Sequence, residues 1–379
     1  MQFRPSLRSV WTLVTLAVVC YGLYLWCENS HVKRKTPFYE EKIAAANLMD
    51  RALRAYQGAT SEKGVFGENY KDPRLDAVIG QQFSLITTDI GAFETEVVGA
   101  NPNFAAVVVD LLGKAGVERG DYVAVGFTGS HPGVNTAVLC ACEALGATPV
   151  TISAVGSSWW GANDPDFTWV DMETLLNREG IVHSLPIAGS FGGINDIGVG
   201  LSQVGQELMK EAIQRNNLAL IHEESVSASV QKRYQRYTDA AKGRKFKAYV
   251  DVGSGIASLG HDENAKLIRN GFNHRLPLQN YPARGVVHLF NADGVPVINI
   301  ADILALSRDY GLGGAHVPLP AIGNGLVFMD DRYDLRVAGI SAFLAILVIV
   351  VLVKLDSRLF KLADNGVDPD TLSTEVIHH

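Results

Sequence analysis

A strand, a glycine-containing turn, a helix and a second strand follow one another in the first half of this chain. The β-rich run 121–127 (DYVAVGF) leads into the turn 128–133, a helical pattern covers 134–145, and the run 148–153 (TPVTIS) is again typical of a strand. A helix that connects two neighbouring strands in this way makes them parallel, because the crossover is right-handed. The sequence therefore predicts a parallel sheet with helical crossovers.

Weaker copies of this pattern lie on both sides of the unit. Helices are expected over 40–56, 104–115, 171–178, 201–215, 225–241 and 301–310, and strands over 83–88, 218–221, 248–252 and 286–290. Strands that alternate with helices are typical of an α/β protein. We expect an open, mostly parallel, Rossmann-like sheet with helices on both faces.

Two long apolar blocks lie near the chain ends. The first, 9–27, contains no charged residue and carries Trp11 and Trp26 towards its two ends as interfacial anchors. It is long enough to span a bilayer, and no cleavage site of small residues follows it, so we expect a retained transmembrane signal anchor. The second block, 337–353, is either a buried core helix or a second span. Charged residues at both of its edges favour the span.

These blocks divide the chain into six parts. We expect a short N-terminal tail (1–8), the signal anchor (9–27), a membrane-proximal helix and loop (28–75), the α/β domain (76–336), a transmembrane helix (337–353) and a C-terminal tail (354–379). The helix expected at 40–56 either packs on the α/β domain or forms a short stalk.

Basic residues beside the two blocks bear on membrane orientation. Residues 33–35 outnumber Arg4 and Arg8 across the first block, which weakly favours a middle domain on the inside. The basic residues after the second block outnumber Arg332 and Arg336 before it, which favours a middle domain on the outside. We expect a two-pass protein whose main domain is extracytoplasmic.

The overall charge disfavours one class of partner. The chain has 33 Lys and Arg against 40 Asp and Glu, a formal net charge of −7, which gives no general attraction to nucleic acid. We therefore expect no nucleic-acid partner.

The four cysteines are interpreted as small apolar residues, since two lie in the first apolar block and two on the expected helix 134–145.

Two long runs resemble a known family. Residues 101–176, which include FTGSHPGVNTAV, and residues 192–213, GGINDIGVGLSQVGQELMKEAI, resemble the bacterial poly-gamma-glutamate system protein. The resemblance covers most of the chain from the N-terminal anchor to about residue 330. It implies an accessory component of the bacterial inner (cytoplasmic) membrane that serves the biosynthesis or export of poly-γ-glutamate as a capsule or secreted polymer. The implied partners are the anionic polymer and other subunits of its synthase or export complex.

The turn 126–133 is the best local candidate for a ligand site, because it joins the end of a strand to the start of a helix. Backbone N–H groups and the helix dipole attract an anion there, and Gly129 allows a ligand close to the backbone. Thr128, Ser130 and Asn135 add hydroxyl and amide contacts that would suit a glutamyl carboxylate. In the alternative interpretation, the glycines only make the turn, and Thr128 or Ser130 caps the helix.

A second glycine turn follows the strand expected at 248–252. It contains Asp251, Gly253, Ser254 and Gly255, and it should face the first turn across the carboxyl ends of the sheet, where ligands of such folds bind. Asp251 either holds a substrate amine, orients a base, or accepts hydrogen bonds from its own backbone as a turn residue.

Two tryptophans, Trp159 and Trp160, follow the strand at 148–153. They are interpreted either as a ligand-binding surface for a polymer or as buried core aromatics.

The cluster 222–224 (HEE) has two interpretations. It supplies a general acid or a metal ligand, or, in the favoured interpretation, it is a solvated loop. We expect no bound metal and no cofactor.

Two classes of function remain open. In the first, the α/β domain binds the polymer or a synthase partner. In the second, it hydrolyses or transfers γ-glutamyl amide bonds, with Ser130 as the nucleophile and His131 or a distant group as the acid–base partner. The sequence lacks G-x-S-x-G, H-E-x-x-H, C-x-x-C and Walker A motifs, which favours binding. Ser229 and Lys232 have the spacing of a catalytic serine–lysine pair, but this spacing is also expected by chance in a chain with this many serines and lysines.

Overall fold

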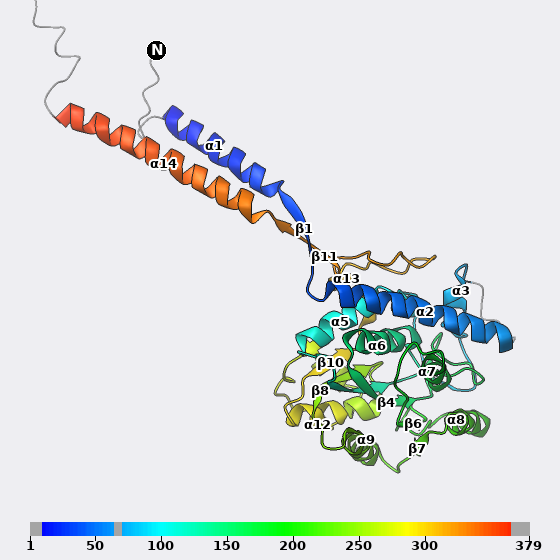
Figure 1. The fold of residues 1–379 in the computed structure, drawn as a ribbon. Helices are drawn as coiled ribbons and strands as arrows, with labels where there is room; N and C mark the ends of the chain where they lie inside the picture. The colour runs from blue at the N-terminus through cyan, green and yellow to red at the C-terminus, as the bar shows by residue number, and fades with distance from the viewer. Residues whose placement is uncertain (1–9, 64–69, 365–379) are drawn as a thin grey trace, which may run out of the picture. The chain divides into compact units, whose positions relative to one another are not determined.

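The computed structural model describes residues 10–63 and 70–364, and these belong to two compact units (Figure 1). One unit combines the two ends of the chain, up to Arg34 and from Asp330 onwards. The other is the continuous stretch Lys35–Met329. The expected N-terminal tail 1–8 and the segment 365–379 lie outside the described residues.

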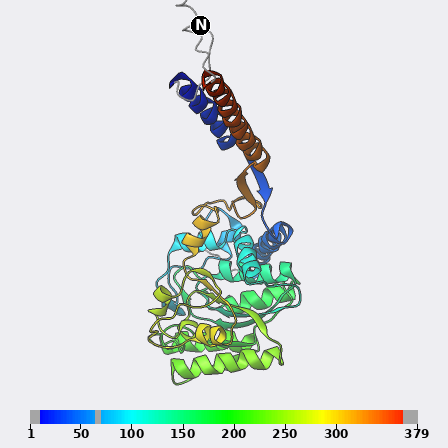
Figure 2. The same cartoon turned by 90° about the vertical axis from the view of Figure 1, so that its left-hand side faces the viewer.

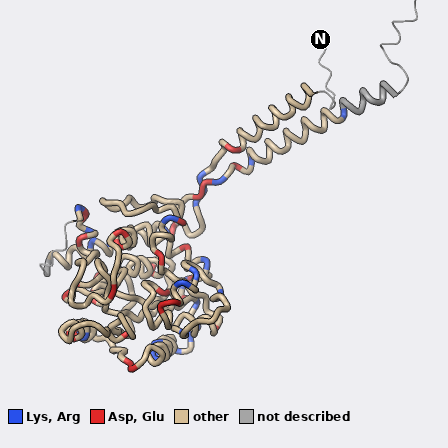
Figure 3. Tube along the Cα trace, turned by 180° about the vertical axis from the view of Figure 1, so that it is seen from behind, with Lys and Arg blue, Asp and Glu red and all other residues tan. Residues whose placement is uncertain are grey.

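The first unit contains two long helices and a small sheet. Helix α1 (Val10–Glu28) leads into β1 (His31–Lys35), which pairs with β11 (Met329–Tyr333), and β11 leads into α14 (Leu335–Asp364). The two helices contact each other. They are nearly free of charged residues over the apolar blocks, and the charges gather at their β1 and β11 ends (Figure 3).

Helices α1 and α14 coincide with the two apolar blocks. By length and composition, Val10–Glu28 and Leu335–Lys354 can each cross a membrane. Large apolar side chains such as Trp11 and Phe343 are exposed on them, which is costly in water. Helix α14 continues to Asp364, so the first part of the expected tail 354–379 is helical.

The second unit is built on a seven-stranded sheet. Its spatial order is β7 (Ala219–Ile221), β6 (Ala188–Ser190), β4 (Thr148–Ala154), β3 (Tyr122–Phe127), β8 (Phe246–Val252), β10 (Val297–Ile300) and β9 (Gly271–Asn273). Neighbouring strands are parallel, apart from β9, which is antiparallel to β10. The predicted α/β fold with a mostly parallel sheet is confirmed.

Helices cover both faces of this sheet (Figures 1 and 2). One face carries α5 (Phe104–Lys114), α6 (Pro132–Leu145), α7 (Trp169–Arg178) and α13 (Ile303–Asp309), and the other carries α9 (Val226–Ala241) and α12 (Val286–Ala292). Helix α8 (Gln203–Arg215) packs beside β7 and α7. The short elements are α3 (Pro73–Asp76), α4 (Phe93–Gly99), α10 (Ile256–Leu259), α11 (Asn264–Leu267) and the parallel pair β2 (Thr87–Asp89) and β5 (Ser157–Ser158).

Helix α2 (Tyr39–Lys63) forms an outer layer over α5 and α6. Met49, Leu53 and Tyr56 on its inner face are fully buried, and the Tyr56 hydroxyl lies 2.9 Å from Oγ1 of Thr136 on α6. The expected helix 40–56 therefore packs on the domain and is no stalk. Because α2 belongs to the compact unit, that unit begins at Lys35. It ends at Met329, and both limits differ from the expected 76–336.

One element differs in type from the prediction. The run 286–290, expected to be a strand, forms helix α12, and the neighbouring strand β10 comes directly after it. A short continuous apolar run has the same pattern in a buried strand and in a buried helix, so periodicity does not separate the two. Within the seven-stranded sheet, the strands β6, β9 and β10 were not predicted.

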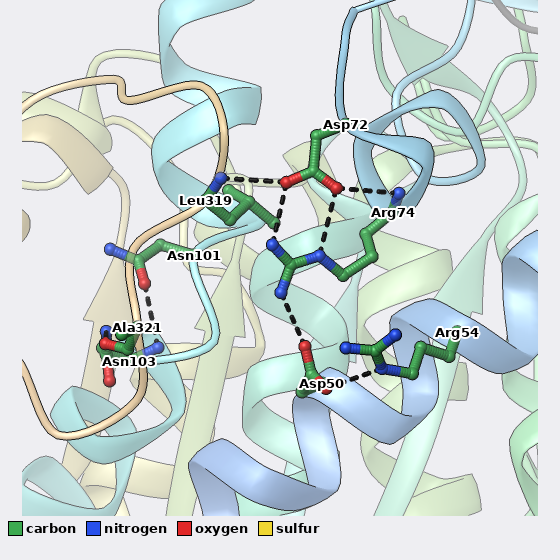
Figure 4. A network of polar contacts seen from close by, with 8 residues as sticks. All are labelled: Asp50, Arg54, Asp72, Arg74, Asn101, Asn103, Leu319 and Ala321. Carbon is green, nitrogen blue, oxygen red and sulfur yellow. Dashed lines mark hydrogen bonds and ion pairs between the residues drawn. The ribbon is translucent and has the colours of Figure 1, made fainter.

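The connection from α13 to β11 is fastened to the domain by buried polar side chains (Figure 4). The Asp72 carboxylate, which also caps α3, accepts the backbone N–H of Leu319 at 2.9 Å. The Asn103 amide donates to the carbonyl of Ala321 at 2.9 Å and accepts the N–H of Gly323 at 3.0 Å. These bonds fix a long stretch without regular structure.

Candidate functional site

A cavity of about 360 Å³ lies at the carboxyl ends of β3 and β8. The chain proceeds from β3 through β4 and β6 to β7 on one side, and from β8 to β10 on the other. Crossovers therefore leave β3 and β8 in opposite directions, which opens a crevice where ligands of parallel sheets bind. Its charged lining residues are Asp89, Asp196, Asp251, Asp262 and Arg233, and its hydroxyl groups belong to Thr88, Thr128, Ser130, Ser254 and Ser258.

The turn after β3 contributes one wall. Thr128 and Ser130 line the cavity, and the Ser130 hydroxyl accepts the backbone N–H of Ser158 at 3.1 Å. Gly129 does not line it; its N–H donates to the carbonyl of Gly156, and a Cβ there would lie 2.7 Å from the Val155 carbonyl oxygen. Gly129 thus allows two loops to pack closely and is not placed to contact a ligand.

The start of α6 is closed by the protein itself. A Cβ on Gly133 would lie 2.7 Å from backbone atoms of Gly99 and Ala100, so the end of α4 packs directly on this helix terminus. Among the described residues that line the cavity, none comes from 131–133. The expected anion site at the N-terminus of α6 is therefore not open, and neither Thr128 nor Ser130 caps this helix, whose first flanking residue is His131.

His131 forms a buried pair with Glu96 of α4. The Nδ1 atom of His131 lies 2.7 Å from Oε1 of Glu96, and only 3% of Glu96 is exposed. Burial lowers the pKa of His131, but the nearby Glu96 carboxylate outweighs burial and the net direction is upward. The sequence pointed to His131 but not to its partner, because Glu96 lies 35 residues earlier on a different helix.

The turn after β8 forms the opposite wall. Gly253, Ser254 and Gly255 all line the cavity. Gly253 has φ +80°, and a Cβ there would lie 2.3 Å from Oγ1 of Thr128. The two glycine turns therefore meet, as their positions at the carboxyl ends of parallel strands led us to expect.

Asp251 lies at the base of the cavity. It sits near the end of β8, in register with Gly126 of β3 and Asn299 of β10, and is 1% exposed. Neither of its carboxylate oxygens has a hydrogen-bond partner among the described residues. Burial raises the pKa of Asp251 to about 7, although the Ser258 hydroxyl, which approaches the carboxylate without a hydrogen bond of normal length, and the charge of Arg233 lower it. Asp251 is thus no turn aspartate bonded to its own backbone.

A third wall comes from the loop 192–198, whose role the sequence did not reveal. Asp196, at φ +63°, forms an ion pair of 2.9 Å with Arg233 of α9 and accepts hydrogen bonds from Ser190 and Ser229. Arg233 is 5% exposed and its charge is matched by Asp196. The high glycine content of this loop was the sequence signal that could have identified it as part of the site.

Besides Gly129, three predicted ligand residues lie outside the cavity. The Asn135 amide is fully buried and donates to the Thr128 carbonyl at 2.7 Å, so it supports the turn from behind. Trp159 and Trp160 pack edge to face on each other, and Trp160 contacts Phe93. Both tryptophans are partly buried and neither lines the cavity. These three side chains shape the surroundings of the site, and they do not form its surface.

The remaining sequence candidates do not assemble into sites. Ser229 donates to Asp196 from inside the core, so it is not paired with Lys232. His222 is exposed and packs against Phe191, as expected for a solvated loop. Within residues 10–63 and 70–364, no group of three or more His, Cys, Asp and Glu side chains could hold a metal ion.

Comparisons with known proteins give little support for a function. No family model and no curated protein matches this chain. One solved structure, O-ureido-L-serine synthase, is 11% identical, with 59% of this chain and 67% of that chain covered and a TM-score of 0.17. An archaeal alanine:glyoxylate aminotransferase is 14% identical, with 84% and 69% covered and a TM-score of 0.16. TM-scores this low carry no argument about fold or chemistry.

Proposed function

We propose that this protein is a membrane-anchored accessory component of poly-γ-glutamate biosynthesis or export, and that its Rossmann-like domain binds a short glutamyl segment of the polymer. The observation that carries the binding role is Asp251, a buried carboxylate without a partner at the base of a polar cavity. Buried polar groups are normally hydrogen-bonded, so an orphaned carboxylate at this place points to a missing ligand group.

The size and lining of the cavity suit a short polar ligand. Its volume of about 360 Å³ is near the lower end of small-ligand sites, which run from about 300 to 1,000 Å³. Five hydroxyl groups and the backbone of the two glycine turns line the cavity. A chain end or a few residues would fit, whereas a long stretch of polymer would not.

The two apolar helices support the membrane part of the proposal. We place α1 and α14 across a bacterial inner membrane, with the domain on the outside, where a secreted polymer emerges. Both apolar segments are long enough for a span, and their exposed side chains would be covered by lipid. A synthase or export subunit would then reach the domain from within the same membrane.

The binding role is tested with the full chain in detergent and a γ-linked glutamate trimer, measured by calorimetry. We expect saturable binding by the natural chain and its loss in Asp251→Asn. The control is Glu173→Gln, because Glu173 is equally buried but lies outside the cavity, where it accepts a hydrogen bond from Ser153 at 2.8 Å. Equal binding by Asp251→Asn and the natural chain would contradict a role for this cavity.

A second candidate function, γ-glutamyl hydrolysis or transfer, is favoured by one contact. Ser130 lines the cavity, and the adjacent His131 is held by Glu96, an arrangement in which a carboxylate orients an imidazole. Mass spectrometry of the trimer after incubation distinguishes the two functions. Shortened or lengthened chains that disappear in Ser130→Ala would establish an enzyme, and an unchanged trimer would leave binding as the function.

A further inference from the structure

We infer that the cavity takes a primary ammonium group on Asp251, so that the domain recognises the amine end of a γ-linked chain and not its interior. This inference rests on the proposed function and names the part of the polymer that the site selects. It also predicts that the protein prefers ligands with a free amine, which can be tested by changing the ligand and leaving the protein unaltered.

The charges of the lining favour a cation. Asp89, Asp251 and Asp262 face the cavity as acids, and the basic side chain at its wall, Arg233, is already paired with Asp196 at 2.9 Å. A ligand carboxylate placed at the base of this cavity would meet a buried acid with no free cation beside it, which is costly. An ammonium there would pair with that acid.

The acceptors near Asp251 match the three donors of an ammonium group. The two carboxylate oxygens of Asp251 have no partner among the described side chains and backbone. The Ser258 hydroxyl, which lines the same cavity, shares a 2.7 Å hydrogen bond with the Tyr249 hydroxyl. When the Ser258 proton is donated to Tyr249, the Ser258 oxygen becomes a third acceptor, so this part of the cavity offers as many acceptors as an ammonium group has protons.

A carboxylate attached next to that amine also finds donors. The Ser130 hydroxyl oxygen accepts the Ser158 N–H, so its own proton can be donated into the cavity. Thr128 and Ser254 present further hydroxyl groups on the facing turns. The lining therefore complements an α-amino acid group, with its ammonium at the base and its carboxylate towards the hydroxyls.

Chemistry limits this group to one end of a γ-linked chain. Each internal nitrogen of the polymer is an amide without charge, whereas the first residue keeps a free α-amine beside its α-carboxylate. A cavity that requires an ammonium therefore binds each polymer once, at its amine end. Such binding has a direction, which suits a component that holds a growing or emerging chain.

The test compares two ligands on the full chain in detergent at pH 8, by calorimetry: a γ-linked glutamate trimer with a free amine and the same trimer acetylated on that amine. We expect acetylation to weaken binding at least about 30-fold, as for removal of one partner from a buried charge pair. In Asp251→Asn, the free-amine trimer should bind as weakly as the acetylated one, and Glu173→Gln should retain the full preference.

The outcomes separate this inference from the proposed function. Equal affinity for the two trimers overturns the ammonium inference and leaves glutamyl binding intact. If neither trimer binds but propylamine binds in an Asp251-dependent way, the ammonium site stands and the polymer is the wrong ligand. If none of the three ligands binds, both proposals are rejected.

Discussion

The imidazole of His131 and the carboxylate of Glu96 lie 2.7 Å apart and join the start of α6 to α4 beside the cavity. Glu96 stands where an external anion was expected, near the N-terminus of α6, so the protein supplies its own acid to this helix end. The contact also fixes the side chain that follows Ser130, and it is the feature on which an enzymatic function would depend.

Removing the acid should lower the pKa of His131. In Glu96→Gln the attraction that raises this pKa is lost, while burial, which lowers it, remains. Proton NMR of the imidazole C–H signals during a pH titration measures the change, with the other imidazole signals as an internal reference. A His131 titration that does not move on this substitution would contradict the pairing.

The Asp196–Arg233 pair should be essential for stability. Both side chains are buried, at 4% and 7% exposure. Arg233→Met leaves Asp196 charged and unpaired, and we expect a loss of about 3–5 kcal/mol in the free energy of unfolding. Urea denaturation followed by tryptophan fluorescence measures it, and the double variant with Asp196→Asn should recover part of the loss.

A surface pair provides the control for that experiment. Lys210 and Glu207 are 3.4 Å apart on α8, and their side chains are 45% and 58% exposed. Lys210→Met should therefore cost less than about 1 kcal/mol. Equal losses at the two sites would show that Asp196 is not held as a buried charge.

Asp251→Asn should stabilise the unliganded protein in a pH-dependent way. The folded-state pKa is about 7, against 3.8 for the free side chain. Below pH 3.8 both states are protonated and the pKa difference has no effect. Between the two values the folded state binds the extra proton, so stability of the natural chain falls as pH rises, and above pH 7 the penalty is complete.

At 1.36 kcal/mol per unit, the advantage of the Asp251→Asn variant should therefore grow to about 4 kcal/mol above pH 7. Urea unfolding of both proteins at several pH values checks this. An advantage that stays constant between pH values of about 4 and 8 would contradict an unpaired, deeply buried carboxylate.

Asn103→Ala should release the α13–β11 connection. The substitution leaves the Ala321 carbonyl and the Gly323 N–H without partners, at a cost of about 1–3 kcal/mol. Hydrogen exchange with mass spectrometry should show faster exchange in peptides that contain Gly323. The control is Asn47→Ala, an exposed residue of α2 that donates only within its own helix and should leave these peptides unchanged.

Much of the fold was predictable, because helix and strand periodicities are local. The unit from β3 through α6 to β4 lies within one or two residues of its expected limits. Two walls of the site were predictable for the same reason, since the ends of parallel strands meet at one edge. The prediction of a strand at 286–290 was wrong, because a short buried helix shows the same run of apolar residues.

The sequence by itself determined the α/β class, the two apolar helices, and the positions of Asp251 and the glycine turns at strand ends. Only the tertiary structure decided that Arg233 is matched by Asp196, that Glu96 reaches His131, and that α4 closes the start of α6. These contacts join residues 33 or more positions apart. Their existence depends on how helices pack across the sheet, and that packing is set by the whole core and not by the spacing of residues along the chain.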